Sequence, residues 1–168
     1  MRRGIMRQLA AFNLYPQEAP NWPWPAIIQM LQHHFLADCQ SQAEIVAQCM
    51  KSNCQLASGV NPLDGCAAAC LQGLRWQTTR RNRPLAWETI CQEIEANRPV
   101  VICWGGHPCI CIGYEALDRH LLVFNPLPIG RGRLETLSYY DYAELFNVQS
   151  LYAIQPVSSR QLEAPALS

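Results

Sequence analysis

The spacing of apolar positions divides the chain into a mainly helical first half and a second half with strand-like alternation. Residues 26–36 are apolar around most of the helical circumference and follow a proline-rich stretch, in which Pro25 suits the first turn of a helix. A helix that is apolar on nearly all sides is typical of a buried position. We therefore expect a central, buried helix over residues 26–36.

Three further helices are expected from local signals. Ser41 and Glu44 form a capping box that opens a helix through Met50. Residues 66–74 have the pattern of a short helix, and residues 86–96 that of an amphipathic helix. Most of the helical sequence therefore precedes residue 97.

After residue 99 the period changes from helical to alternating, which predicts strands. The expected strands cover residues 100–104, 107–113, 121–125 and 150–154, with a short one over 9–14. A helical turn is expected at Tyr139, and the arginine-rich stretch 80–83 is expected to be a solvated loop. Helices followed by antiparallel strands predict an α+β domain, which we place over residues 1–156, with a flexible tail over 157–168.

Composition excludes several classes of partner. The 168 residues carry no net charge and only 15% are charged, so no electrostatic attraction to nucleic acid or anionic membranes is expected. The N-terminus is basic, but Arg7 and Gln8 interrupt the apolar stretch that a secretory signal needs. No apolar run approaches membrane-spanning length. We therefore expect a cytoplasmic protein.

The chain has nine cysteines, an odd number, so at least one of them has no disulfide partner within the chain. Without an export signal, reduced thiols are expected. Several cysteines gather in one region and suggest a zinc site: Cys39, Cys49, Cys54, Cys66 and Cys70. They lack the closely spaced Cys-x-x-Cys pairs of structural zinc sites, so we expect no metal and no cofactor.

Three separated residues suggest a catalytic constellation. Gln17 lies six residues before Pro23, near the start of the expected buried helix. His107 follows a Gly-Gly turn, and Asn125 ends a strand before a proline. Taken singly, each is an ordinary loop or strand-end residue. Their order matters because a cysteine peptidase needs a base, a group that orients the base, and donors for the oxyanion.

The surrounding sequence resembles the bacterial papain-like cysteine peptidases of the C39-like and C70-like families. The likeness rests on Asn-Trp-x-Trp-x-Ala at residues 21–26, the segment 94–101, the Gly-Gly-His turn, Ile-Gly-Tyr at 112–114 and the Asn-Pro at 125–126. It spans residues 15–145. It implies a papain-like fold with a buried helix packed on a C-terminal sheet, and a site formed by Gln17, His107 and Asn125.

The chain departs from this family at the nucleophile. Family members typically read Asn-Trp-Cys-Trp-Ala-Ala, whereas this sequence has Pro23 in the cysteine position. Proline has neither a thiol nor a backbone N–H, so it supplies neither the nucleophile nor an oxyanion donor. The resemblance therefore implies a pseudoprotease that binds a peptide or protein partner. Trp22, Trp24 and Trp104 are candidate contacts for that partner.

Two alternatives stay open at the level of sequence. A different thiol, Cys109, Cys111 or Cys66, could act with His107 in an active cysteine peptidase or another hydrolase. The chain could also be a structural interaction domain within a complex.

Overall fold

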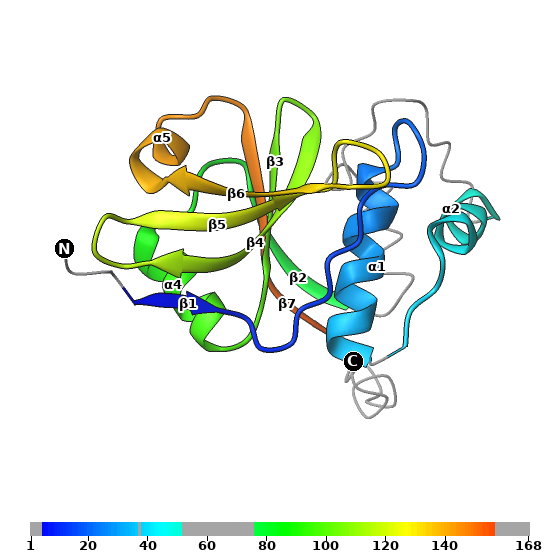
Figure 1. Ribbon diagram of the computed structural model, residues 1–168, viewed down its shortest axis with the longest axis horizontal. Coiled ribbons are helices and arrows are strands. Elements are labelled where there is room, and N and C mark those ends of the chain that lie inside the picture. The colour runs from blue at the N-terminus through cyan, green and yellow to red at the C-terminus, as the bar shows by residue number, and fades with distance from the viewer. Residues whose placement is uncertain (1–4, 37, 52–75, 157–168) are drawn as a thin grey trace, which may run out of the picture.

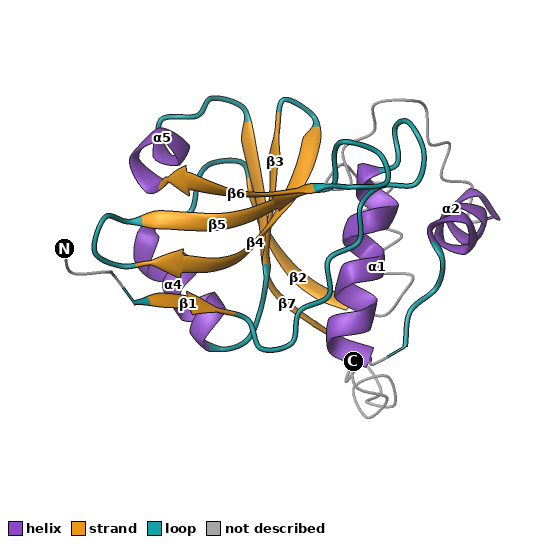
Figure 2. Ribbon diagram, in the orientation of Figure 1, coloured by secondary structure: helices purple, strands orange, loops and turns teal. Residues whose placement is uncertain are grey.

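The computed structural model describes residues 5–36, 38–51 and 76–156, which combine an antiparallel sheet with helices (Figures 1 and 2). The strands are β1 (Met6–Gln8), β2 (Trp76–Arg81), β3 (Val100–Trp104), β4 (His107–Glu115), β5 (His120–Asn125), β6 (Arg133–Ser138) and β7 (Val148–Pro156). The helices are α1 (Pro23–Leu36), α2 (Gln42–Lys51), α4 (Trp87–Glu95) and α5 (Tyr139–Ala143). No helix within these ranges is long and apolar enough to cross a membrane.

The sheet has the strand order β2-β7-β3-β4-β5-β6, and β1 adds to β4 outside this path. Every pairing is antiparallel. Strands β3 and β4 form a hairpin in which Trp104 pairs with His107, and the turn between them uses Gly105 and Gly106 at φ +57° and +79°. Glycine adopts these left-handed angles without strain. The turn therefore fixes His107 at the first position of β4.

Helix α1 is the buried centre of the helical part, as the sequence predicts. It lies beside the sheet, contacts β4, and has α2 on its other side (Figure 1). Residues 24–32 of α1 are all buried, and Ile27, Ile28 and Leu31 join the same core cluster as Val101 and Ile110 of the sheet. Burying so many aliphatic side chains removes a large apolar area from water, which is the main stabilising contribution to this fold.

A local signal explains the start of α2, and the apolar pattern explains the position of α4. In α2, Ser41 and Glu44 form the expected capping box, since Ser41 N donates to Glu44 Oε2 at 2.8 Å and Glu44 N to Ser41 Oγ at 3.3 Å. Helix α4 lies close to the predicted range 86–96 and buries Ile90 and Ile94.

Several predictions of secondary structure were wrong. The arginine-rich stretch 80–83 was predicted to be a loop, but its first two residues, Arg80 and Arg81, belong to β2. This strand lies at the edge of the sheet and pairs with β7. The N-terminal strand covers residues 6–8 instead of 9–14, and β6 was missed altogether. The exposed stretches of β1 and β6 are held by backbone pairing and need no apolar alternation. The predicted helix 66–74 and the tail 157–168 lie outside the described residues.

Candidate functional site

A cleft of about 320 Å³ opens at the N-terminal end of α1. Its lining comes from the segment before α1, the β3–β4 turn and the loop after β5: Gln17, Pro20, Asn21, Pro23, Gly106, His107, Leu127 and Ile129. Three of the four predicted site residues, Gln17, Pro23 and His107, therefore line one cleft. The fourth, Asn125, lies behind His107 and is hydrogen-bonded to it.

The hydrogen bonds of Asn125 select the tautomer of a neutral His107 ring. Asn125 Oδ1 accepts from the backbone N–H of Leu127 at 2.9 Å, which identifies this atom as the amide oxygen. The same oxygen lies 2.7 Å from His107 Nε2, so Nε2 carries the proton and donates it. The Nδ1 atom of the neutral ring is then unprotonated. The site thus retains an oriented imidazole that can accept a proton.

Gln17 is held rigidly at the cleft by the loop that follows Asn125. Its backbone N–H donates to Pro126 O at 3.1 Å, and its carbonyl accepts from Gly130 N at 3.0 Å. The side chain is only 2% exposed, and its Nε2 donates to Ala19 O at 2.9 Å. Its Oε1 is buried and has no hydrogen-bond partner among the described residues.

Helix α2 also helps to place Gln17, through a single buried amide. Gln42 is fully buried, and its Nε2 donates to Pro16 O at 2.8 Å and to Gln29 Oε1 at 3.1 Å. Its Oε1 accepts from Glu18 N at 2.9 Å. Gln42 thus fastens the residues on both sides of Gln17 to α2 and to α1. No feature of the sequence had indicated this role.

Pro23 is the first residue of α1, where a missing N–H costs no helical hydrogen bond. This explains why the helix begins three residues earlier than predicted, at Pro23 instead of Ala26. Among the described residues that line the cleft, none carries a thiol or a hydroxyl group. The cleft therefore combines a base with a helix N-terminus, but it offers no side-chain nucleophile of the serine or cysteine type.

The alternative thiols near His107 are poorly suited to attack. Burial, with a smaller contribution from Glu135, raises the pKa of Cys109 to about 12. Burial also raises the pKa of Cys111 to about 12. Both thiols are protonated at neutral pH, whereas the thiolate is the nucleophile. Cys66 lies outside the described residues. None of the six cysteines within the described ranges forms a disulfide.

A second pocket, of about 560 Å³, adjoins His107 and Asn125. Its apolar lining comes from β3, β4, β5, β6 and the segment after α5: Ile102, Trp104, Cys109, Val123, Leu137 and Leu145. Glu135 and Asp141 also line it. His107 therefore lines both pockets. The sequence did not indicate Leu127 and Ile129, because apolar residues in a Pro- and Gly-containing loop give no periodic signal. It did not indicate the second pocket either.

The three candidate partner-binding tryptophans differ in exposure. Trp104 is 57% exposed and borders the second pocket, so its side chain is available for contact. Trp22 is half-buried. Trp24 is only 4% exposed and belongs to the core cluster, so a contact role for its side chain does not fit its position. It follows the all-round apolar pattern of α1, which buries nearly every residue of the first turns.

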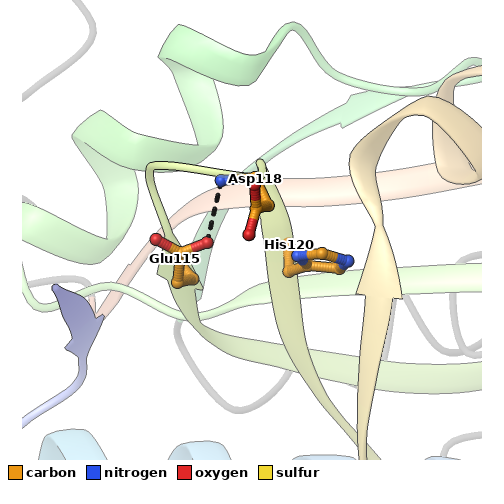
Figure 3. Close-up of side chains that lie close together, drawn as sticks. All are labelled: Glu115, Asp118 and His120. Carbon is orange, nitrogen blue, oxygen red and sulfur yellow. Dashed lines mark hydrogen bonds between the residues drawn. The ribbon is translucent and has the colours of Figure 1, made fainter. Parts of the chain in front are cut away.

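Glu115, Asp118 and His120 lie close together at the turn between β4 and β5, with ligand atoms within 4.8 Å of one another (Figure 3). The turn itself accounts for Glu115, whose carboxylate accepts from Leu117 N at 2.7 Å and Asp118 N at 2.9 Å. The sequence had suggested, but did not favour, a zinc site among Cys39, Cys49, Cys54, Cys66 and Cys70, and the last three of these lie outside the described residues.

We expect Glu115 to titrate below the ordinary range of a glutamate. The backbone N–H groups of Asp118 and Leu117 hold its pKa low in the folded protein. A lowered folded-state pKa stabilises the fold above the ordinary pKa, and this contribution is lost as the pH falls through the folded value. An NMR titration of the Glu115 side chain measures this directly. A midpoint at or above that of a free glutamate would contradict the turn geometry.

Comparison with known proteins shows the fold. No protein-family model and no curated protein matches the sequence. Among solved structures, the chain is similar to the peptidase domain of Streptococcus ComA, a bi-functional ABC transporter involved in quorum sensing. The two superpose with a TM-score of 0.60 at 12% identity, over 86% of this chain and 98% of that domain. UfSP from C. elegans superposes with a TM-score of 0.56 at 15% identity, over 92% of this chain but only 35% of UfSP. The chain therefore has an α+β papain-like fold.

Proposed function

We propose that this papain-like domain is a pseudoprotease that binds a peptide or protein partner through its cleft without cleaving it. The observation that carries the proposal is the position of Pro23. It stands at the head of α1, in one cleft with Gln17 and His107, where a papain-like mechanism requires a thiol. The substitution also removes a backbone N–H, and loss of one oxyanion donor costs about 3–4 kcal/mol in enzymes that use one.

The retained parts of the cleft support a binding role. Gln17 and His107 are held by backbone and side-chain hydrogen bonds, so the cleft has a defined shape. Leu127 and Ile129 line the cleft and are 37% and 46% exposed, and Trp104 borders the adjoining apolar pocket. Exposed apolar side chains beside a preformed pocket are typical of a surface that receives apolar groups of a partner. A peptide with apolar side chains is the class of ligand that these pockets fit.

Selection from a library of displayed random peptides tests the proposal. The immobilised full-length protein should enrich peptides that contain apolar side chains, and those peptides should remain intact after prolonged incubation. Ile129→Arg places a charge in the cleft and should weaken the binding of enriched peptides at least about tenfold, because a charged group then meets apolar ligand surface. Binding is measured by titration calorimetry.

The matched control is Leu117→Arg. Leu117 is 61% exposed and lies at the β4–β5 turn, so this variant adds the same charge away from the cleft lining. It should bind the enriched peptides as the wild type does. Cleavage of the peptides, or equal loss of binding in both variants, would overturn the proposal.

A further inference from the structure

A cysteine outside the cleft lies close to a phenol and to an imidazole, and the imidazole can take up a proton. Cys39 follows the C-terminal end of α1, where its Sγ lies 4.0 Å from Tyr15 Oη and 3.9 Å from His33 Nδ1. Tyr15 Oη in turn lies 2.5 Å from His33 Nδ1, and the two rings are stacked. Thiol, phenol and imidazole therefore come together from three separate segments of the chain.

The local structure holds Cys39 in this position. The next residue, Gln40, is tied to α1 by two hydrogen bonds with Gln32: Gln40 N donates to Gln32 Oε1 at 3.0 Å, and Gln32 Nε2 donates to Gln40 Oε1 at 2.9 Å. Gln32 is 3% exposed, so this anchor is part of the interior. Cys39 itself is partly exposed.

The hydrogen-bond directions form a relay. The Cys39 thiol donates toward Tyr15 Oη, and in the His33 tautomer with Nδ1 unprotonated the Tyr15 hydroxyl donates to that atom. If the phenol passes its proton to Nδ1 and takes the thiol proton, the result is a thiolate, a neutral tyrosine and an imidazolium. Burial and the neighbouring Cys39 raise the pKa of Tyr15, so the phenol gives up its proton only as it takes the thiol proton.

We infer that Cys39 is a nucleophilic thiol, activated by Tyr15 and His33, that exchanges with low-molecular-weight disulfides. The Cys39 thiolate attacks one sulfur of the disulfide, forming a new S–S bond while the original S–S bond breaks. The Cys39 sulfur is oxidised and the leaving sulfur is reduced. The proton held on His33 passes to the leaving thiolate, which departs as a thiol. This site is independent of the cleft at Pro23.

The surroundings of other cysteines show why Cys39 differs. Cys91 is also partly exposed, but burial together with Glu95 and Glu88 raises its pKa to about 11. Among the described residues, the Cys39 sulfur lies within hydrogen-bond distance of the Tyr15 phenol and the His33 imidazole, and the carboxylate of the preceding residue, Asp38, is exposed. An adjacent imidazolium favours a thiolate, whereas adjacent carboxylates oppose it.

Site-resolved mass spectrometry of the full-length protein tests the inference. At pH 7, iodoacetamide should modify Cys39 at least about tenfold faster than Cys91, and oxidised glutathione should add one glutathionyl group at Cys39. His33→Gln and Tyr15→Phe should each slow both reactions of Cys39 at least about fivefold, because each breaks the relay. The added group should be released by a reducing agent.

The neighbouring His34 provides the matched control. Its Nε2 lies 2.8 Å from Asn97 O and its ring packs on Phe12, so it belongs to a different set of contacts. His34→Gln should leave the rates at Cys39 unchanged. A Cys39 rate no greater than that of Cys91, or equal rates at Cys39 in His33→Gln, Tyr15→Phe and the wild type, would overturn the inference. Thermal unfolding of each variant separates loss of the relay from loss of the fold.

Discussion

Replacing Pro23 by cysteine should create a thiol that alkylating reagents modify about 100-fold faster than Cys109 at neutral pH. The new thiol would stand at the N-terminal end of α1, where the helix dipole favours a thiolate, and in the same cleft as His107. Cys109 is the internal reference because burial raises its pKa to about 12. Site-resolved mass spectrometry after brief alkylation provides the measurement.

The imidazole should account for much of this reactivity. Asn125 holds the His107 ring with Nε2 protonated and Nδ1 unprotonated, so the ring can take the thiol proton. The double variant Pro23→Cys with His107→Gln keeps the thiol and the helix but removes the base. It should lose at least about tenfold in alkylation rate relative to Pro23→Cys alone. If both variants react no faster than Cys109, residue 23 does not occupy a nucleophile position.

The second large effect concerns stability. Arg98→Met should lower the free energy of unfolding by about 3 kcal/mol, because it leaves a buried carboxylate without its counter-charge. The Glu93 side chain is 7% exposed and accepts from Arg98 Nε and Nη2, both at 2.8 Å, and from Ala153 N at 2.9 Å. Glu93 thus joins α4 to β7. Urea unfolding followed by circular dichroism measures the change.

An exposed ion pair gives the matched control for this substitution. Arg133 and Glu135 form a salt bridge on β6 in which the side chains are 65% and 42% exposed. Pairs in contact with water contribute little, so Arg133→Met should change the free energy of unfolding by less than about 1 kcal/mol. Equal destabilisation by Arg98→Met and Arg133→Met would show that burial of Glu93 does not govern the effect.

The sequence predicted the central elements better than the edges of the sheet. The interior helix α1 and the strand β3 carry continuous apolar signals, and β3 was predicted with its observed bounds, Val100–Trp104. Strand β2 was mistaken for a loop because its residues are mostly polar and its pairing with β7 uses backbone groups. Backbone hydrogen bonding leaves no trace in the order of side chains, so an edge strand of this kind is hard to recognise from sequence.

The candidate site, like the fold, was predicted only in part. The order of Gln17, His107 and Asn125 along the chain, together with the family resemblance, was enough to suggest that they meet, and the structure places them together. Their roles in binding stay a prediction. The contacts of Gln42 and the cluster around Cys39 could not be foreseen, because each joins segments whose separation follows no helical or strand period.

His107 lines two cavities, and this has a consequence for the length of any ligand. A short ligand can fill one cavity and gains nothing from the other. A ligand long enough to reach both cavities delivers its second half at a high effective concentration once the first half is bound. Affinity should therefore rise in a step, and not gradually, as a ligand is extended residue by residue from one cavity into the other.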